Sequence, residues 1–329
     1  MGRKGLYSIL IVIGVLVGST FITKDEPFML KEKQPKIGVL QFVSHPALDE
    51  IYQGFLSELN KQGYKDGKNI KLVFQNAQGD QNKLLTMSQY LREEKVSVSV
   101  GIATPSAQAL ANVMSDKQPV VLGAVSDPKA AGLVSNNEHP GGYITGVSDQ
   151  APVKEQIQLM KELLPNLKRV GILYSSSEDN SSAQVKKFKQ LAPSDWDVKE
   201  YSVPTHNEIK QMTQVMVQEV EAIYIPIDNT IADGLEMVVQ LADDKKVPII
   251  PSAETMVEAG GLATVGINQF KLGEQTAKMT IDILEHKKKP GDMPIYTFNT
   301  GDKVINQKKA EELGIKIPKQ LTSYLKVLD

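Results

Sequence analysis

The sequence predicts an α/β protein of two similar lobes, each built on a doubly wound parallel sheet with helices on both faces. The length of 329 residues suits two domains better than one. Apolar strands alternate with helical periodicity along most of the chain, which is the pattern of βαβ units with right-handed crossovers. The pattern also repeats, because the strand and polar turn in PKIGVLQFVSHPALD (35–49) have a counterpart in KRVGILYSSS (168–177).

The first lobe begins with residues 37–40, an apolar run typical of a strand buried on both faces. A polar turn and a helix over 47–60 follow it. Asp80 and Thr104 are the expected N-caps of two later helices, the second with Pro105 at its first helical position. The other elements expected in this lobe are strands over 69–75, 96–100, 119–122 and 142–147, and helices over 80–94 and 104–114.

The second lobe repeats this order, and Asn207 is the expected cap of one of its helices. Its expected strands cover 169–174, 197–203, 222–225, 247–250 and 262–267. Its expected helices cover 153–164 and 207–218, with two more ending at 191 and 243. A helix over 270–285, a strand over 295–300 and a helix over 307–313 complete the chain.

Several crossovers between the lobes predict a hinge, since a few loop residues must absorb any closing motion. The predicted division gives residues 34–149 and 268–289 to the first lobe, and 150–267 and 290–329 to the second. Residues 1–33 precede both.

Composition excludes several classes of function. The net charge of −2 offers no strong attraction to nucleic acid. The absence of cysteine excludes disulfides, thiolate chemistry and a lipid-modified N-terminal cysteine. The four histidines are scattered without metal-ligand spacing, so we expect no metal site and no cofactor.

The N-terminal segment has the pattern of an export signal. Arg3 and Lys4 precede an apolar run over 6–22, and Lys24-Asp25-Glu26-Pro27 ends it. The run is at the lower limit for spanning a bilayer, and a cleavage site is not clear. Both a cleaved signal peptide and an uncleaved signal-anchor stay open, and we favour the anchor. Either one predicts that the folded part lies outside the cytoplasmic membrane.

The predicted ligand site lies between the lobes, at the carboxyl ends of the strands, where ligands bind in doubly wound sheets. The candidate residues are mostly small hydroxyl and acidic side chains without Lys or Arg. They are Phe42, Val43, Ser44, Ala103, Thr104, Ser106, Ser126, Asp127 and Asp149 in the first lobe, and Tyr174, Ser175, Ser181, Pro226, Asp228, Asn229, Thr230 and Ser252 in the second.

This set suits a zwitterion such as an α-amino acid. Helix N-termini can hold a carboxylate without a basic side chain, and Asp228, or next Asp149, can pair with an ammonium group. Ser44, Thr104 and Ser126 are the candidates beside the carboxylate. The alternative is that Asp228-Asn229-Thr230 is only a turn and N-cap. We expect a structural role for His45, and either stacking on the ligand or core packing for Phe42 and Tyr174.

The sequence resembles the extracytoplasmic substrate-binding proteins of ABC transporters, in the branch for tryptophan or tyrosine uptake in Gram-positive bacteria. The segments that carry the resemblance are KIGVLQFVSHPALDEIYQGF, VGIATPSAQAL, VLGAVSDPKAAGLV, ITGVSDQAPV, GILYSSSEDNS, YIPIDNTIADG and VPIIPSAETMVEAGGLATVGINQFKLG. Their order and spacing from Lys36 to Gly273 are more specific than any one of them.

The resemblance implies a type I periplasmic-binding-protein fold that closes on an aromatic amino acid, with tryptophan as the first candidate. It also implies a permease and an ATPase as partners, and a monomer tethered to the outer face of the membrane. The chain departs from many Gram-positive relatives in lacking a lipobox cysteine.

Two other classes of function are disfavoured, and one stays open. An enzyme is not expected, because the sequence has no G-x-S-x-G elbow, no G-x-G-x-x-G after the first strand and no Walker sequence. A regulator of the lac-repressor type would have a helix-turn-helix where this chain has its apolar segment. The open alternative is a membrane-tethered sensor domain of the same fold that binds another small metabolite.

Overall fold

The structure is a computed structural model that describes residues 34–114, 118–298 and 300–326. Residues 35–329 form one compact unit. The predicted export signal over 1–33 lies outside the described residues. Among the residues that are described, no helix has the length and apolar character needed to cross a membrane.

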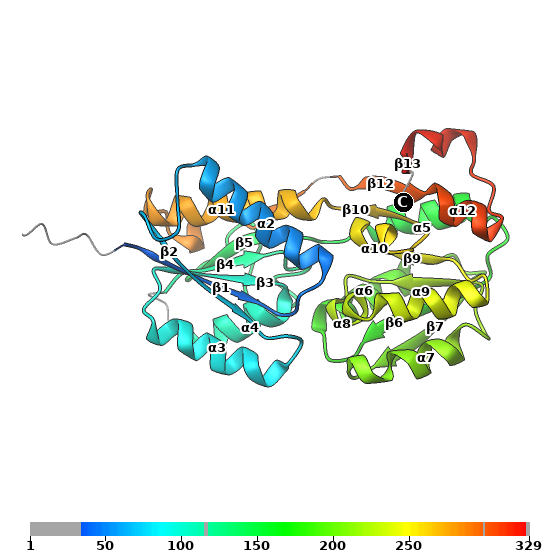
Figure 1. Cartoon of the computed structure of the whole chain (residues 1–329), viewed down its shortest axis with the longest axis horizontal. Coiled ribbons are helices and arrows are strands. Elements are labelled where there is room, and N and C mark those ends of the chain that lie inside the picture. The colour runs from blue at the N-terminus through cyan, green and yellow to red at the C-terminus, as the bar shows by residue number, and fades with distance from the viewer. Residues whose placement is uncertain (1–33, 115–117, 299, 327–329) are drawn as a thin grey trace, which may run out of the picture. The chain divides into compact units, whose positions relative to one another are not determined.

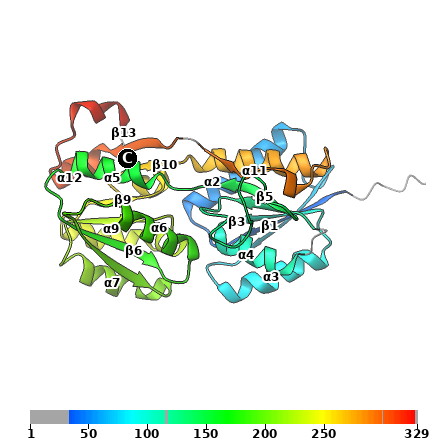
Figure 2. The same ribbon diagram turned by 180° about the vertical axis from the view of Figure 1, so that it is seen from behind.

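The first lobe contains a parallel sheet with the strand order β11-β5-β4-β3-β1-β2. Helices α2 and α11 lie together over one face of this sheet, and α3 and α4 cover the other (Figures 1 and 2). One continuous apolar core fills both layers. The strands are β1 (Lys36–Gln41), β2 (Lys71–Asn76), β3 (Val98–Ile102), β4 (Val120–Gly123), β5 (Ile144–Ser148) and β11 (Tyr296–Thr297), and the helices are α2 (Pro46–Lys61), α3 (Gln81–Glu93), α4 (Thr104–Val113) and α11 (Gln269–Leu284).

The second lobe contains a parallel sheet with the order β7-β6-β8-β9 and two apolar clusters, one on each side of it. Its strands are β6 (Arg169–Ser175), β7 (Asp197–Val203), β8 (Ala222–Ile225) and β9 (Ile249–Pro251). Its helices are α5 (Val153–Leu163), α6 (Asp179–Leu191), α7 (Ile209–Met216), α8 (Asn229–Asp233), α9 (Leu235–Asp244), α10 (Glu254–Glu258) and α12 (Gln307–Leu313). Short 3₁₀ turns cover His206–Glu208, Pro290–Asp292 and Lys319–Tyr324.

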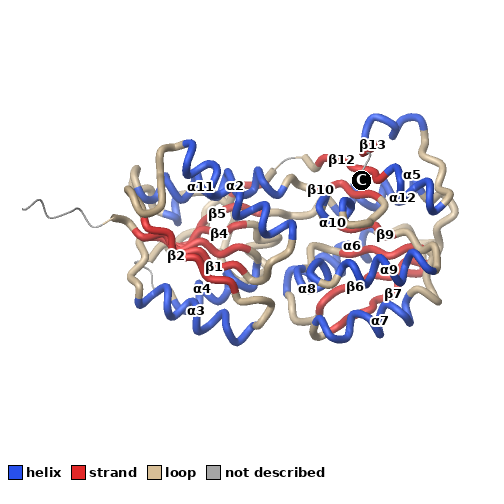
Figure 3. The backbone as a smooth tube through the Cα atoms, viewed as in Figure 1, coloured by secondary structure: helices blue, strands red, loops and turns tan. Residues whose placement is uncertain are grey.

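The strand expected at the edge of this second sheet pairs elsewhere. β10 (Ala263–Gly266) is antiparallel to β12 (Asp302–Asn306), which is parallel to β13 (Leu325–Lys326). These three strands form a separate group beside the main sheet (Figure 3). A hydrogen bond of 2.7 Å from the Leu262 N–H to the Ile249 carbonyl keeps β10 next to β9. β10 therefore pairs along its whole length with β12 of the C-terminal segment and does not join the main sheet.

The chain returns to the second lobe later than the predicted boundary at residue 290. β11 pairs with β5 in the first sheet, and the Thr145 hydroxyl donates to the Met293 carbonyl at 2.7 Å. Met293 and Ile295 belong to the first apolar core. Residues 290–297 are thus part of the first lobe, and the expected crossover near Lys289 is corrected to a point after Thr297. A strand over 295–300 is predicted from the sequence, but the sequence does not show which sheet it joins, because its partner β5 is distant in sequence.

Helices α2 and α11 touch through glycines. A Cβ added at Gly54 would lie 2.0 Å from the Phe270 carbonyl oxygen, and one at Gly273 would lie 1.9 Å from the Ile51 carbonyl oxygen. The two backbones can therefore approach only because both positions lack a side chain. The N-terminal ends of both helices reach the pocket described next.

Candidate ligand-binding site

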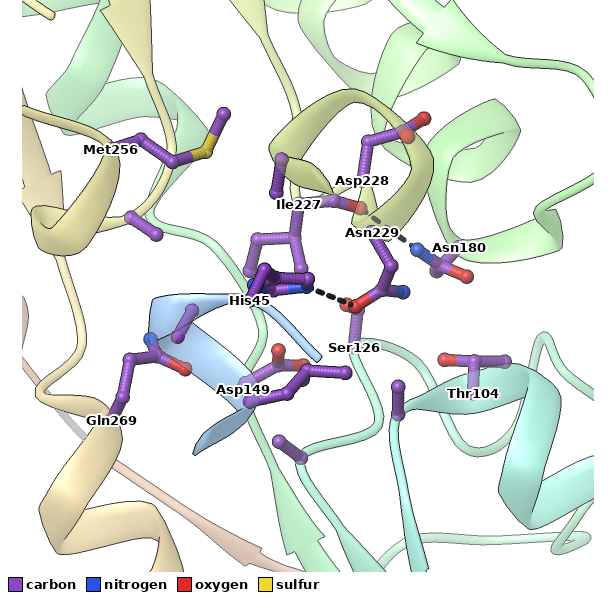
Figure 4. A pocket seen from close by; sticks show the side chains of 16 residues that line it. His45, Thr104, Ser126, Asp149, Asn180, Ile227, Asp228, Asn229, Met256 and Gln269 are labelled. Carbon is purple, nitrogen blue, oxygen red and sulfur yellow. Dashed lines mark hydrogen bonds between the residues drawn. The ribbon is translucent and has the colours of Figure 1, made fainter. Parts of the chain in front are cut away.

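A pocket lies between the two lobes, where the carboxyl ends of both sets of strands meet (Figure 4). Its volume is about 440 Å³, including the open space at its mouth. Its described walls include neither Lys nor Arg. They are His45, Ala47, Leu48, Ala103, Thr104, Ala124, Ser126, Asp149, Asn180, Ile227, Asp228, Asn229, Ala232, Ala253, Met256 and Gln269.

Asp149 is the acidic residue of the pocket with a carboxylate oxygen available to accept a hydrogen bond. It follows β5 where the chain leaves the first lobe, and it is 4% exposed. Its Oδ1 atom has no hydrogen-bond partner within the described part of the chain. Burial raises the pKa of this carboxyl group to about 6, although a hydrogen bond from Ser126 acts in the opposite direction. A buried carboxylate in this condition is a site for a cation.

Asp228 also lines the pocket, but each of its two oxygens already has a backbone partner. One accepts from the Ser175 N–H at 2.6 Å, and the other accepts from the Ile231 N–H at 2.8 Å as the N-cap of α8. Its carboxylate is turned away from Asp149 and Ser126 (Figure 4). Burial and then the nearby Glu178 carboxylate raise the pKa of Asp228 to about 7.

Helices α2 and α4 are among those that begin at the pocket. Ala47 and Leu48 belong to the first turn of α2, and Thr104 begins α4. The first N–H groups of an α-helix have no acceptor within the helix, and they carry partial positive charge. Neither helix has a side-chain cap at its N-cap residue. These ends can therefore bind a carboxylate without a basic side chain.

The backbone beside α4 is in unusual conformations. Ala103 has φ 75° and ψ 157°, and Ala124 has φ 63°. Both residues line the pocket, and both lie where glycine is normally preferred. Ala103, rather than the predicted Thr104, is the N-cap residue of α4, so Thr104 is inside the helix. Strain of this kind collects at binding sites, where the surrounding structure enforces it.

Six of the predicted residues line the pocket together. They are Ala103, Thr104, Ser126, Asp149, Asp228 and Asn229. Contact of these residues with a ligand stays a prediction.

The other predicted residues lie outside this pocket, and most have evident structural partners. Phe42, Val43 and Thr230 line a wider groove at the cleft, and Ser44 donates to the Asp49 carboxylate. The Tyr174 hydroxyl donates to Glu200, and Asp127 accepts from the Ala130 N–H. Ser175, Ser181, Pro226 and Ser252 are buried beside the pocket wall, and Ser106 is buried inside the first turn of α4.

Several wall residues were missed by the sequence reasoning. His45 was assigned a structural role, yet its Nε2 atom lies 3.3 Å from the Asn229 Oδ1 atom of the other lobe. Its position directly before Pro46 and a helix was the available signal, because it places the ring at a helix N-terminus that faces the cleft. Apolar wall residues such as Ala232, Ala253 and Met256 carry no such signal, since the same residue types fill the cores.

Comparison with known proteins identifies the family. The model of the family described as "ABC transporter substrate binding protein" matches residues 36–326. The chain belongs to this family.

Relatives of this substrate-binding protein include two with a stated ligand. A tyrosine-binding protein of Clostridioides difficile is 37% identical over 286 residues, covering 87% of this chain and 82% of the relative. A protein from Streptococcus pneumoniae, solved in complex with L-Trp, is 49% identical, with a TM-score of 0.86 over 89% of this chain and 98% of that one. These matches confirm the resemblance and the α/β fold of the type I binding proteins.

A third relative was solved in a ligand-free, open form. This substrate-binding protein with adhesive properties from Clostridium difficile is 37% identical and matches 90% of this chain and 100% of its own, with a TM-score of 0.67. The described part of this chain therefore superposes better on the L-Trp complex than on the open relative.

Proposed function

We propose that this substrate-binding protein captures an aromatic L-α-amino acid, tryptophan first, in the pocket between its lobes. The observation that carries the proposal is the Asp149 oxygen, which has no partner among the described residues, in a pocket that the N-termini of α2 and α4 also reach. The ligand ammonium group binds Asp149, and its carboxylate binds the first N–H groups of α2 and α4. This assignment replaces Asp228 as the first choice for the ammonium group.

The apolar walls favour a large, flat side chain. Five of the wall residues are alanine, which leaves room that larger side chains would fill. Met256 adds a thioether of the kind that packs favourably against aromatic rings. The two relatives with stated aromatic ligands support the same choice.

The protein works outside the cytoplasmic membrane, tethered by its N-terminal segment, and passes its ligand to a permease driven by an ATPase. Family membership supports this role. It performs no reaction on the ligand, so the amino acid recovered after release is expected to be chemically unchanged.

Calorimetry on residues 35–329 tests the ligand class. L-Trp, L-Tyr and L-Phe are compared with tryptamine, which lacks the carboxylate, and with indole-3-propionate, which lacks the ammonium group. We expect binding of aromatic amino acids and at least tenfold weaker binding of both truncated analogues, because each leaves a buried polar group unpaired. Binding of a simple sugar, with none of the amino acids, would overturn the proposal.

A further inference from the structure

His45 and Asn229 form a hydrogen bond between the lobes inside the pocket. His45 precedes α2 in the first lobe, and Asn229 begins α8 in the second. The His45 Nε2 atom and the Asn229 Oδ1 atom are 3.3 Å apart, and the two residues are 7% and 4% exposed. This bond exists only while the lobes are together, so it belongs to the closed state.

The buried carboxylate of Glu178 fixes the direction of this bond. Glu178 is 1% exposed and accepts from the Asn229 side-chain nitrogen at 2.6 Å. It also accepts from the backbone N–H and the hydroxyl of Thr230, at 2.9 and 2.8 Å. A carboxylate that accepts these bonds requires the Asn229 NH₂ group on its own side. The Asn229 oxygen must then face His45, and the His45 Nε2 atom must carry the proton.

Burial and the polar groups around His45 shift its pKa in opposite directions. Burial lowers the pKa of His45, which is the largest effect, and the Asn229 hydrogen bond and neighbouring carboxylates raise it. The ring is therefore neutral in the closed state at neutral pH. The titratable groups that face it from the packed elements and the pocket are Glu178, Asp233, Asp49, Asp149 and Asp228.

We propose that Glu178, Asn229 and His45 form a hydrogen-bonded positioning chain that holds the lobes closed while the His45 imidazole is neutral. In acid this chain weakens, and the protein retains its ligand less tightly. The inference rests on the proposed function, because it concerns release from the same pocket. Opening exposes His45 to water and returns it toward its ordinary pKa of 6.5. The open form then binds a proton more readily than the closed form, so closure weakens as the pH falls below that value.

Two substitutions of His45 separate its hydrogen bond from its titration. In His45→Gln, an amide N–H can still donate to Asn229 but cannot take up a proton near neutral pH. Because His45 lines the pocket, both variants are expected to raise the Kd for L-Trp at about pH 7.5, and His45→Ala is expected to raise it about three- to tenfold more than His45→Gln. Rescue by Gln but not by Ala distinguishes a positioning role from loss of packing.

The pH profile is the second readout. Wild-type affinity is expected to fall between about pH 7.5 and about pH 5.5, by up to tenfold per pH unit from His45 itself. His45→Gln is expected to keep only the part of the pH dependence that comes from the pocket aspartates Asp149 and Asp228. Equal slopes for wild type and His45→Gln would overturn the proposal.

The tautomer of His45 tests the positioning chain directly. In ¹⁵N-labelled protein saturated with L-Trp, we expect the His45 signals of an Nε2–H imidazole. Glu178→Gln places an amide donor opposite Asn229 and turns the Asn229 oxygen away from His45. The variant is then expected to lose the Nε2–H signature. An unchanged His45 tautomer in a folded Glu178→Gln protein would contradict the proposed positioning chain.

Failure of the proposed function looks different from failure of this inference. If wild type binds none of the aromatic amino acids, the proposed function is wrong. If wild type binds L-Trp while the His45 variants keep its affinity and slope and Glu178→Gln keeps the His45 tautomer, only the positioning chain is wrong.

Discussion

At the residue scale, the two pocket aspartates have different roles despite similar burial. Asp228 is 2% exposed and Asp149 is 4% exposed. Asp228 binds two backbone N–H groups, and it therefore holds α8 and β6 together. Asp149 keeps one oxygen without a partner among the described residues. The pattern Asp228-Asn229-Thr230 attracts notice in the sequence because it is a capping pattern, and a cap needs the oxygens that a ligand would use.

Asp149→Asn is expected to abolish tight binding while stabilising the ligand-free protein. The raised pKa of Asp149, about 6 against an ordinary 3.8, means that the folded state binds the proton more tightly than the unfolded state. Above pH 6, the charged group therefore costs about 3 kcal/mol of folding stability, and the cost fades as the pH falls toward 3.8. The variant should melt a few degrees higher at neutral pH, as measured by calorimetry, and bind L-Trp at least tenfold more weakly.

Asp127→Asn is the matched control, because this half-buried aspartate lies outside the pocket and caps a local turn. It should leave both the affinity and the pH dependence of the melting temperature unchanged. An Asp149→Asn protein with wild-type affinity would remove Asp149 from the ammonium site.

At the element scale, the close contact of α2 and α11 links two walls of the pocket. His45 lies at the start of α2 and Gln269 at the start of α11, and both residues line the pocket. Gly273→Ala would place a methyl group 1.9 Å from the Ile51 carbonyl oxygen and 2.7 Å from the Phe55 nitrogen. The helices must separate, and overpacking of this kind costs about 1–3 kcal/mol. Chemical denaturation should show that loss, with weaker L-Trp binding beside it.

Lys271→Ala provides the comparison on the same helix, because Lys271 is exposed. Its stability should stay within about 0.5 kcal/mol of wild type. Wild-type stability in Gly273→Ala would show that α11 can move aside without cost, contrary to the buried, backbone-to-backbone contact.

Most elements could be predicted from the sequence because buried parallel strands and capped helices have strong local signals. β1, α3 with its Asp80 cap, β6 and α12 follow their predicted ranges closely. β11 lies inside the strand predicted over 295–300, but its pairing with β5 and the pairing of β10 with β12 could not be predicted, since the partners of these strands are distant in sequence. The same limit applied to the site. The polar residues of the site could be predicted because they follow strand ends. Its alanines could not, because they line the pocket only where the two lobes meet.

At the scale of the whole described unit, polar contacts join the lobes across the cleft. Besides His45 and Asn229, the Gln108 side chain donates to Asp179 at 2.9 Å, and the Gln184 side chain donates to the Ser126 hydroxyl at 3.4 Å. Hydrogen bonds contribute on the order of 1 kcal/mol each, so these few contacts hold closure only weakly without a ligand. The higher TM-score to the L-Trp complex than to the open relative is consistent with two arrangements of one fold.

Ligand-driven closure can be measured directly because the chain contains no cysteine. Cysteines introduced at the exposed positions Lys83 on α3 and Lys210 on α7 can carry spin labels on the two lobes. Without ligand, we expect a broad distance distribution that includes open forms, and L-Trp should narrow it toward the shorter distance of this structure. The ligand bridges Asp149 and the helix ends, so it stabilises the arrangement in which its partners converge. In His45→Ala, more L-Trp should be needed for the same narrowing. A distribution that L-Trp leaves unchanged, in protein shown by calorimetry to bind it, would mean that the lobes do not close on their ligand.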